Sequence, residues 1–338
     1  MGSWEYVQKL GMGWNLGNTL DACTVEGSSP LEQETKWGNP LTTKAMITMV
    51  KNAGFDILRI PVSWYSQMDE NYVINSAWLA RVKKVVDYGY NSGMTVIINI
   101  HHDDWHFPDE MNYHKSSKIL KKIWTQITKF FIEYDERLIF EGMNEPRKKG
   151  TPHEWNGGDV EGRRVVMKLN QDFVDTVRAT EGNQMRMLMV PTYAASAYEI
   201  AMSDFSIPQG KNLIVSIHAY VPYPFALDPD MSKKWTIEQQ QPINCLFELI
   251  DRYFLSKNIP VIIGECGARR KGDNDIDRAA WASYYTEVAR QRGVPCIWWD
   301  SGCVDSQVER EVFGLLNRYE LRWEYPSIVA AFLGKKHL

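Results

Sequence analysis

The segment Ile139-Phe140-Glu141-Gly142-Met143-Asn144-Glu145-Pro146 joins an apolar run to polar side chains, and its design decides the fold. The run that ends at Phe140 is short and lies before a glycine and a proline, which indicates a core strand rather than a helix. Pro146 cannot continue a hydrogen-bonded ladder, and it biases Glu145 toward an extended backbone. We therefore predict that Glu145 lies at the carboxyl end of a buried strand.

A second segment, Val261-Ile262-Ile263-Gly264-Glu265-Cys266-Gly267, repeats this design. Carboxylates are usually exposed, so either glutamate alone could be a solvated loop residue. Two apolar strands that each end in a carboxylate are harder to explain in that way. The pair therefore indicates a reaction site, with Glu145 and Glu265 as the candidate catalytic residues.

Helical and apolar segments alternate along the whole chain. The spacing of apolar and capping residues predicts helices at 42–53, 76–92, 116–134, 161–181, 236–256 and 278–292, with a terminal helix that begins at Pro326. After a first strand near Gly13, apolar runs predict strands at 55–61, 94–100, 137–140, 185–190, 213–220, 261–267 and 294–300. Eight alternating units favour a closed parallel sheet. The predicted fold class is α/β, with residues 1–338 as a single catalytic (β/α)8 TIM barrel domain.

An open, doubly wound sheet is the alternative to the barrel. That fold would carry a glycine-rich fingerprint after its first strand, but Gly11-x-Gly13 lacks the third glycine and leads into no helix. The connection from Cys23 to Pro40 is long, and loops of this length are often functional. Trp37 on it is predicted to be either a ligand platform or a lid over a small satellite core.

Composition excludes several classes of protein. The 338 residues are 44% hydrophobic and 24% charged with a net charge of -4, which gives no support for a nucleic-acid partner or a membrane partner. The five cysteines form no CxxC pair, which argues against a disulfide framework and a zinc site. No apolar run reaches 18 residues and no export signal is visible, so we expect either a cytoplasmic protein or one whose export signal is missing from this sequence.

Polar residues lie at or just after the carboxyl ends of most predicted strands. In a (β/α)8 barrel the carboxyl ends of all strands meet on one face, where active sites lie. Polar groups near a core are costly unless they are paired, so their gathering on one face indicates a site. The residues at these positions are Asn18, Arg59, His101, His102, Asn144, Glu145, His218, Tyr220, Glu265 and Trp299.

Two carboxylates that face each other across a barrel mouth are suited to glycoside hydrolysis. This reaction needs one protonated acid and one anion beside the sugar carbon. Arg59 supplies a positive charge that would keep one carboxylate ionised, whereas a less charged surrounding would keep the other protonated. The 13 tryptophans and 16 tyrosines add flat surfaces on which sugar rings can stack.

With these residues in place, the chain resembles glycoside hydrolase family 5 of clan A, and within it the bacterial endoglucanases of subfamily 4. The motifs occur in order from Gly13 to Trp299. They are Gly13-Trp14-Asn15-Leu16-Gly17-Asn18-Thr19, Trp37-Gly38-Asn39-Pro40, Arg59 after its strand, Asn144-Glu145-Pro146, His218-x-Tyr220, Gly264-Glu265 and Trp298-Trp299. The resemblance implies a retaining mechanism without a metal or organic cofactor, in which Glu145 is the acid/base and Glu265 the nucleophile.

The resemblance also implies roles for the other site residues. Asn144 would bind the 2-hydroxyl of the sugar under attack, Arg59 and Tyr220 would hold the Glu265 carboxylate, and His218 would lie near Glu145. The sugar on the non-reducing side would be bound by Asn18, His101, His102 and Trp299, with Trp298 as the alternative to Trp299 and Trp37 as an extra platform. The expected protein is a secreted monomer whose partner is a polysaccharide.

β-1,4-Glucan is the first choice of substrate, with mixed-linkage β-glucan and xyloglucan close behind it. Mannan and xylan stay open, because specificity depends on the loops around Trp37, His106–His114 and Pro222–Pro229. We expect the carboxyl oxygens of Glu145 and Glu265 to lie about 5–5.5 Å apart, as in retaining enzymes. The rate should then depend on pH as a bell, with the acid limb from Glu265 and the basic limb from Glu145.

Two rival functions are compatible with parts of the pattern. A metal-dependent barrel hydrolase would use His101-His102-Asp103-Asp104-Trp105-His106 with His218 and Glu265. Adjacent residues on a strand point to opposite faces, so the first two histidines are not expected to ligate one ion. A non-catalytic carbohydrate-binding barrel should lack one of the two carboxylates, but both are present.

Overall fold

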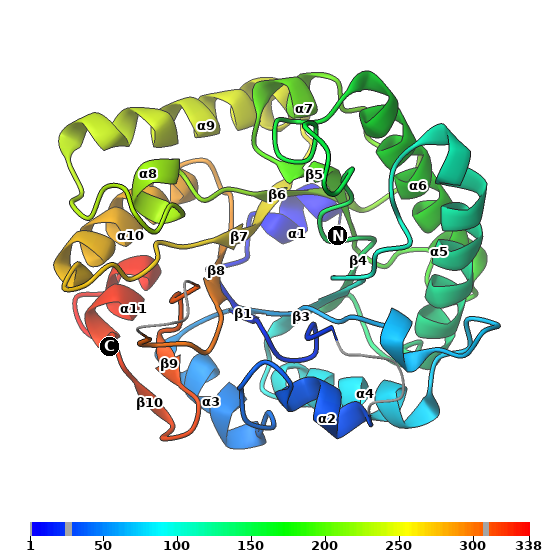
Figure 1. Cartoon of the computed structure of the whole chain (residues 1–338), viewed down its shortest axis with the longest axis horizontal. Coiled ribbons are helices and arrows are strands. Elements are labelled where there is room, and N and C mark those ends of the chain that lie inside the picture. The colour runs from blue at the N-terminus through cyan, green and yellow to red at the C-terminus, as the bar shows by residue number, and fades with distance from the viewer. Residues whose placement is uncertain (1, 24–28, 307–310) are drawn as a thin grey trace.

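Eight parallel strands form a closed barrel in the computed structural model, which describes residues 2–23, 29–306 and 311–338. The strands follow one another around the barrel in sequence order, and β1 pairs with β8 to close it (Figure 1). Their bounds are β1 Gly13–Leu16, β2 Ile57–Ile60, β3 Thr95–Asn99, β4 Leu138–Glu141, β5 Leu188–Ser196, β6 Leu213–His218, β7 Val261–Cys266 and β8 Cys296–Asp300. The predicted fold class is therefore confirmed.

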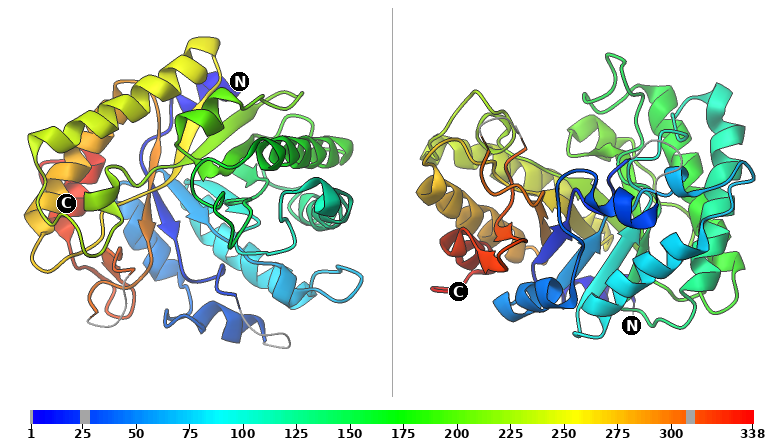
Figure 2. Two further views of the ribbon diagram at one scale, coloured as in Figure 1. Left: turned by 45° about the horizontal axis from the view of Figure 1, so that its top comes forward. Right: turned by 60° about the horizontal axis from the view of Figure 1, so that its bottom comes forward.

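Helices surround the barrel, as Figures 1 and 2 show. They are α1 Ser3–Val7, α2 Pro30–Thr35, α3 Lys44–Ala53, α4 Ser76–Tyr90, α5 Glu110–Phe130, α6 Val160–Ala179, α7 Glu199–Ser203, α8 Tyr223–Ala226, α9 Gln240–Tyr253, α10 Asp275–Arg290 and α11 Pro326–Leu333. Short 3-10 helices span η1 Tyr65–Gln67, η2 Ile237–Gln239 and η3 Leu255–Lys257. None of the helices within the described ranges is long and apolar enough to cross a bilayer.

Two helices differ from the sequence prediction for local reasons. α5 begins at Glu110, six residues before its predicted start, because the Asp109 side chain accepts a hydrogen bond from the backbone N–H of Asn112 and caps the helix there. α2 lies in the segment that we predicted as a loop. It begins with a reciprocal capping box between Ser29 and Glu32.

The barrel interior begins with an apolar layer at its amino-terminal end. Isoleucines and methionines from neighbouring strands form one buried cluster with Tyr6 and Val7 of α1, which lies at this end of the ring (Figure 1). Alternation along a strand then directs the residue two positions later to the interior as well. The strand residues of this cluster are Ile57, Ile97, Ile139, Met189, Ile214, Ile262 and Ile297, and Met187 joins them from just before β5.

The segment after β8 is tied to the barrel by a buried charge pair. It contains the hairpin β9 Leu316–Asn317 and β10 Arg322–Trp323, followed by α11, which packs on α10. Arg318 contacts Asp300 at 3.1 Å and donates to the backbone oxygen of Gly17 at 2.9 Å. Asp300 also accepts hydrogen bonds from Trp14 Nε1 and from the backbone N–H groups of Gly302, Leu315 and Leu316.

Candidate active site

Arg59 lies at the centre of the polar end of the barrel. It is fully buried, and its guanidinium donates from Nε to Glu141 Oε2 at 2.8 Å and from Nη1 to Glu265 Oε1 at 2.9 Å. Nη1 also donates to Asn15 Oδ1 at 2.9 Å, and Nη2 donates to Asn144 Oδ1 at 2.8 Å. Burial lowers the pKa of Arg59, but the two carboxylates outweigh it and raise the pKa above its ordinary value. Arg59 is therefore a permanent cation.

Glu265 is turned into the barrel by an irregularity in β7. Ile262 faces the interior, so a regular strand would direct Gly264 inward and Glu265 outward. A Cβ on Gly264 would meet His218 Nε2 at 3.0 Å, which places that glycine toward the interior. The pairing of β7 with both neighbouring strands then shifts register next to Glu265. Such a bulge re-aims a side chain, and here it directs a second consecutive residue into the site.

Glu145 lies opposite Glu265, in the loop after β4. The strand ends at Glu141, so the prediction that Glu145 lies at the strand end is wrong by four residues. His218 connects the two carboxylates, because its Nδ1 is 2.9 Å from Glu145 Oε1 and 3.6 Å from Glu265 Oε1. One oxygen of each glutamate and one ring nitrogen of His218 all lie within 4.8 Å of one another. Tyr220 OH donates to Glu265 Oε2 at 2.9 Å.

Burial and the neighbouring charges shift the pKa values of all three groups. Burial raises the pKa of Glu265, and although His218 and Arg59 oppose this, the pKa stays above its usual range. Burial also acts on Glu145, but the hydrogen bond and charge of His218, together with Arg147, bring its pKa below the usual range. Burial lowers the pKa of His218, and the two carboxylates more than reverse this. In the unliganded site these effects favour the protonated form of His218 and the ionised form of Glu145.

A row of aromatic rings forms the other side of the site. His101 is stacked on Trp299, with ring centroids 5.8 Å apart and an angle of 2° between the ring planes. The ring centroids of His101 and His102 are 4.4 Å apart. Trp37, which is 42% exposed, continues the row at 5.5 Å from His102. Trp299 faces the site, whereas Trp298 is fully buried in the outer core, so the structure places Trp299 in the predicted position. Asn18 is partly buried.

His101 and His102 do not point to opposite faces, which corrects our argument against a shared ion. Both follow the end of β3, and their Nε2 atoms lie 4.0 Å and 3.9 Å from Asp21 Oδ2. These three side chains, like Glu145, His218 and Glu265, could bring one ligand atom each to a metal ion. In His101, however, Nδ1 is 3.1 Å from the Asn99 amide nitrogen. Because Nδ1 must accept there, the ring proton lies on Nε2, which is then a donor and not a metal ligand.

Sequence reasoning missed several residues of this site. Asp21 is fully buried, and burial raises its pKa to about 7 even though it accepts backbone hydrogen bonds. Arg147 donates to the backbone oxygen of Glu145 at 2.9 Å and lies 3.5 Å from its carboxylate. The sequence contained a signal for four further residues, because each stands two positions after an inward-facing residue of β1, β3, β4 or β6. Arg59 has the same position in β2. These four are Asn15, Asn99, Glu141 and Ser216.

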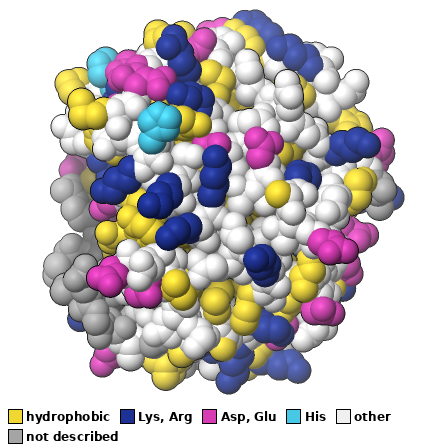
Figure 3. Space-filling model, turned by 90° about the vertical axis from the view of Figure 1, so that its right-hand side faces the viewer, with side chains coloured by type: hydrophobic (Ala, Val, Ile, Leu, Met, Phe, Trp, Pro, Cys, Tyr) yellow, Lys and Arg dark blue, Asp and Glu magenta, His cyan; other side chains and the backbone are white. Residues whose placement is uncertain are grey.

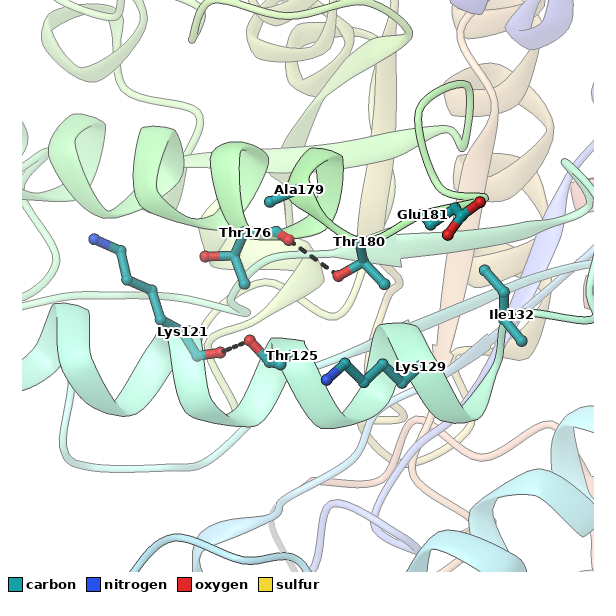
Figure 4. A pocket seen from close by; sticks show the side chains of 8 residues that line it. All are labelled: Lys121, Thr125, Lys129, Ile132, Thr176, Ala179, Thr180 and Glu181. Carbon is teal, nitrogen blue, oxygen red and sulfur yellow. Dashed lines mark hydrogen bonds between the residues drawn. The ribbon is translucent and has the colours of Figure 1, made fainter.

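A groove on the outer surface does not belong to this site. It has a volume of about 650 Å³ and lies between α5 and α6 (Figure 4). Figure 3 shows lysine and arginine side chains on this side of the molecule. Neither candidate catalytic glutamate is among the lining residues, which are Lys121, Thr125, Lys129, Ile132, Thr176, Ala179, Thr180 and Glu181.

Comparison with known proteins bears on the family of the chain. Residues 22–303 match the model of the family described as Cellulase (glycosyl hydrolase family 5). The chain belongs to glycosyl hydrolase family 5. It is 46% identical over 340 residues to endoglucanase A of Clostridium longisporum, covering 97% of this chain and 65% of that relative. It is 43% identical over 337 residues to endoglucanase A of Ruminococcus albus, covering 97% of this chain and 91% of that one.

Solved structures of the same family resemble the whole barrel. The GH5-4 broad specificity endoglucanase from Ruminococcus champanellensis with bound cellotriose superposes with a TM-score of 0.95 at 43% identity, over 98% of each chain. A GH5 xyloglucan-specific endo-β-1,4-glucanase from a metagenomic library, also in complex with cellotriose, gives a TM-score of 0.94 at 38% identity over 98% of each chain. The resemblance to family 5 and to its endoglucanases is thereby confirmed.

Proposed function

We propose that this family 5 chain is a retaining, endo-acting β-glycoside hydrolase that cleaves β-1,4-glucan through a covalent glycosyl-enzyme. The observation that carries the proposal is the approach of Glu145 and Glu265, whose nearest oxygens lie within 4.8 Å. Retaining enzymes hold their carboxyl groups about 5–5.5 Å apart, whereas inverting enzymes leave about 6.5–9.5 Å for a water molecule. The short separation supports direct attack by one carboxylate on the sugar.

Glu265 is the nucleophile in this proposal. Its Oε1 accepts from Arg59 and its Oε2 from Tyr220, so the carboxylate is held in a fixed orientation. In the first step Glu265 forms a bond to the anomeric carbon, while Glu145 protonates the glycosidic oxygen that leaves. In the second step Glu145 takes a proton from water, the water oxygen bonds to the anomeric carbon, and Glu265 is released.

His218 supplies the proton that Glu145 needs for the first step. The 2.9 Å hydrogen bond between His218 Nδ1 and Glu145 Oε1 lets a proton pass from one to the other without movement of the heavy atoms. The His218–Glu145 pair contains one shared proton in either of two states. In one state His218 is an imidazolium and Glu145 a carboxylate, and in the other His218 is neutral and Glu145 is a carboxylic acid. Glu145 can therefore act as the acid even though its pKa is lowered in the unliganded site.

The remaining residues bind the sugar in this proposal. Asn144 directs its Oδ1 to Arg59, so its amide nitrogen is the end that can donate to the 2-hydroxyl of the sugar under attack. The row from Trp299 to Trp37 offers ring faces and ring N–H groups to the units on the non-reducing side. We also propose that residues 1–338 act as a single, monomeric catalytic domain without a cofactor, and that the protein is secreted because glucan polymers are extracellular.

Replacement of the nucleophile tests the mechanism. We expect Glu265→Ala to lower the turnover of carboxymethyl cellulose by at least about 10⁴-fold while oligosaccharide binding persists. Glu248→Ala, which removes an exposed carboxylate on α9, is the matched control and should keep the wild-type rate. Undiminished turnover in Glu265→Ala would refute the assignment. Proton NMR of the first products should show the β-anomer, and initial formation of the α-anomer would exclude retention.

The substrate is tested separately with purified polysaccharides. We expect cleavage of β-1,4-glucan, mixed-linkage β-glucan and xyloglucan, and slower cleavage of mannan and xylan. Products of intermediate length at early times would support endo-action, whereas release of cellobiose alone would contradict it. Activity should survive treatment with a chelator, and its loss and recovery on return of a divalent ion would favour the metal-dependent alternative.

A further inference from the structure

Glu141 is a carboxylate that no sugar can reach. It ends β4, is fully buried, and has three hydrogen-bond donors from three other strands. Arg59 Nε and Asn99 Nδ2 donate to Oε2 at 2.8 Å and 3.0 Å, and Ser216 Oγ donates to Oε1 at 2.7 Å. Arg59 and Glu141 form a fully buried ion pair at 2.8 Å, so Glu141 brings a negative charge to this group. Any effect of Glu141 on the reaction must therefore pass through its neighbours.

One route leads through Arg59 to the nucleophile. Glu141 binds the Nε edge of the guanidinium, which turns the two terminal nitrogens toward Glu265 and Asn144. Two carboxylates share this single cation, so each receives only part of its electrostatic stabilisation. Without the negative charge of Glu141, the full charge of Arg59 would act on Glu265. The nucleophile would then be a weaker base that ionises at lower pH.

A second route leads through Asn99 to the sugar side of the site. The Asn99 amide oxygen accepts from the backbone N–H of Val62 at 3.1 Å, and its amide nitrogen donates to Glu141. This fixes which end of the amide faces His101, whose Nδ1 lies 3.1 Å from that nitrogen. Burial, together with the charges of His102 and Arg59, keeps the pKa of His101 well below its usual value, so the ring is neutral. Its single proton is then held on Nε2.

We propose that Glu141 is a positioning residue whose buried charge sets both the charge that Arg59 presents to Glu265 and, through Asn99, the tautomer in which His101 meets the sugar. The inference rests on the proposed function, because Glu265 has to be the nucleophile for the first route to affect the rate. In this proposal Glu141 couples the nucleophile Glu265 to the sugar-binding residue His101. A single substitution should therefore change the chemistry without removing any group that touches the substrate.

Glu141→Gln isolates the charge from the hydrogen bonds. The glutamine oxygen can accept from Arg59 and Asn99, and its amide can donate to Ser216, whose hydroxyl can reverse its role. We expect the acid limb of the pH profile of kcat/KM to move to lower pH by roughly one unit, because a neighbouring charge shifts a carboxyl pKa by about 1–3 units. We expect kcat at the optimum to fall about tenfold, since a carboxylate that is less basic attacks more slowly.

Ser216→Ala is the matched control, because it removes a hydrogen bond from Glu141 and leaves the charge in place. Its acid limb should stay at the wild-type pH, and thermal unfolding should show that both variants are folded. An acid limb that stays at the wild-type pH in folded Glu141→Gln overturns the route through Arg59. If Glu265→Ala lacks turnover in the same experiments, the proposed function stands while this inference falls.

Nitrogen-15 NMR of the histidine rings tests the second route in the wild-type protein itself. We expect His101 to carry its proton on Nε2 between pH 5 and pH 8, which gives a shift pattern distinct from that of the other neutral tautomer. A proton on Nδ1 would overturn the route through Asn99. This measurement does not depend on the folding of any variant or on the identity of the nucleophile.

Discussion

Two successive layers inside the same barrel have opposite chemistry. The layer next to α1 contains Ile57, Ile97, Ile139, Ile214 and Ile297, all fully buried. Two residues further along the same strands, the layer at the carboxyl ends contains Arg59, Asn99, Glu141, Ser216 and Trp299. The strands, their register and the inward direction of the side chains are the same in both layers.

The difference between the two layers shows that one contributes mainly to stability and the other to both stability and catalysis. Each buried isoleucine contributes about 1.5–3 kcal/mol by leaving water, whatever its neighbours are, provided that the space is filled. A buried charge or amide is stable only if its partners are present, because an unpaired polar group in a low-dielectric interior is costly. Substitutions in the first layer should therefore change stability alone, and substitutions in the second should change both stability and catalysis.

The largest effect is expected from Arg59→Met in the polar layer. This change leaves the carboxylates of Glu141 and Glu265 buried close together without their shared cation. Removal of one partner from a buried ion pair costs about 3–5 kcal/mol, so the free energy of unfolding should fall by this amount. Turnover should be lost as well, because the nucleophile is no longer held. Urea unfolding and hydrolysis of carboxymethyl cellulose measure the two effects.

Arg137→Met serves as the control for that substitution. Arg137 pairs with Asp135 at 3.0 Å, but the two side chains are 37% and 45% exposed. Exposed pairs contribute about 0–1 kcal/mol, so this variant should keep nearly all of its stability and its rate. Equal losses in Arg59→Met and Arg137→Met would contradict the distinction between the layers.

A smaller effect, on stability alone, is expected in the apolar layer. Met187 is buried there, before β5, and Met187→Ala should lower the free energy of unfolding by about 2–5 kcal/mol because it leaves a cavity. Met187→Leu keeps the volume and should cost less than about 1.5 kcal/mol. At a temperature where both variants are folded, their pH profiles should match that of the wild type. A shifted acid limb in Met187→Ala would show that the two layers are not independent.

The last effect, which appears only as the pH changes, concerns Asp21 at the edge of the polar layer. Its folded pKa of about 7 lies above the value of about 3.9 for an unfolded chain. Between these two values the folded state keeps a proton that the unfolded state has released, so Asp21 makes the protein less stable as the pH rises from 4 to 7. Asn cannot titrate. The stability of Asp21→Asn relative to wild type should therefore rise over this interval, by at most about 4 kcal/mol, because each pKa unit between the two states corresponds to about 1.4 kcal/mol. Thermal unfolding at pH 4.5 and pH 7.5 would detect it, and a constant difference would contradict it.

The sequence was sufficient for the fold because the barrel repeats one signal eight times. Each strand is a short apolar run and each long helix has a regular apolar spacing, so errors at single boundaries did not affect the topology. The start of α5 and the whole of α2 were missed because capping by Asp109 and by Ser29 decides them locally. Capping contacts of this kind outweigh the apolar periodicity from which we had placed the helix starts.

The candidate site could be predicted only where residues stand out by type. Glu145, Glu265, Arg59 and His218 were found because ionisable groups within or next to apolar runs are unusual, and their functional roles stay predictions. Glu141 was overlooked because we took the apolar run to end at Phe140 and assigned the polar group of that strand to Glu145, whereas β4 extends to Glu141. Only alternation from Ile139 marks its inward direction. The orientation of His101 and His102 could not be derived from strand periodicity, because both lie beyond the end of β3.

The pair formed by Asp300 and Arg318 has a consequence for how the molecule can be shortened or recombined. The match to the family ends at residue 303, although the partners of Asp300 include Arg318 and the backbone of Leu315 and Leu316. A protein cut at that boundary would keep all eight strands but would leave a buried carboxylate without its cation. For exchange of modules between barrels, the unit that should be transferred therefore extends past the last strand to include Arg318.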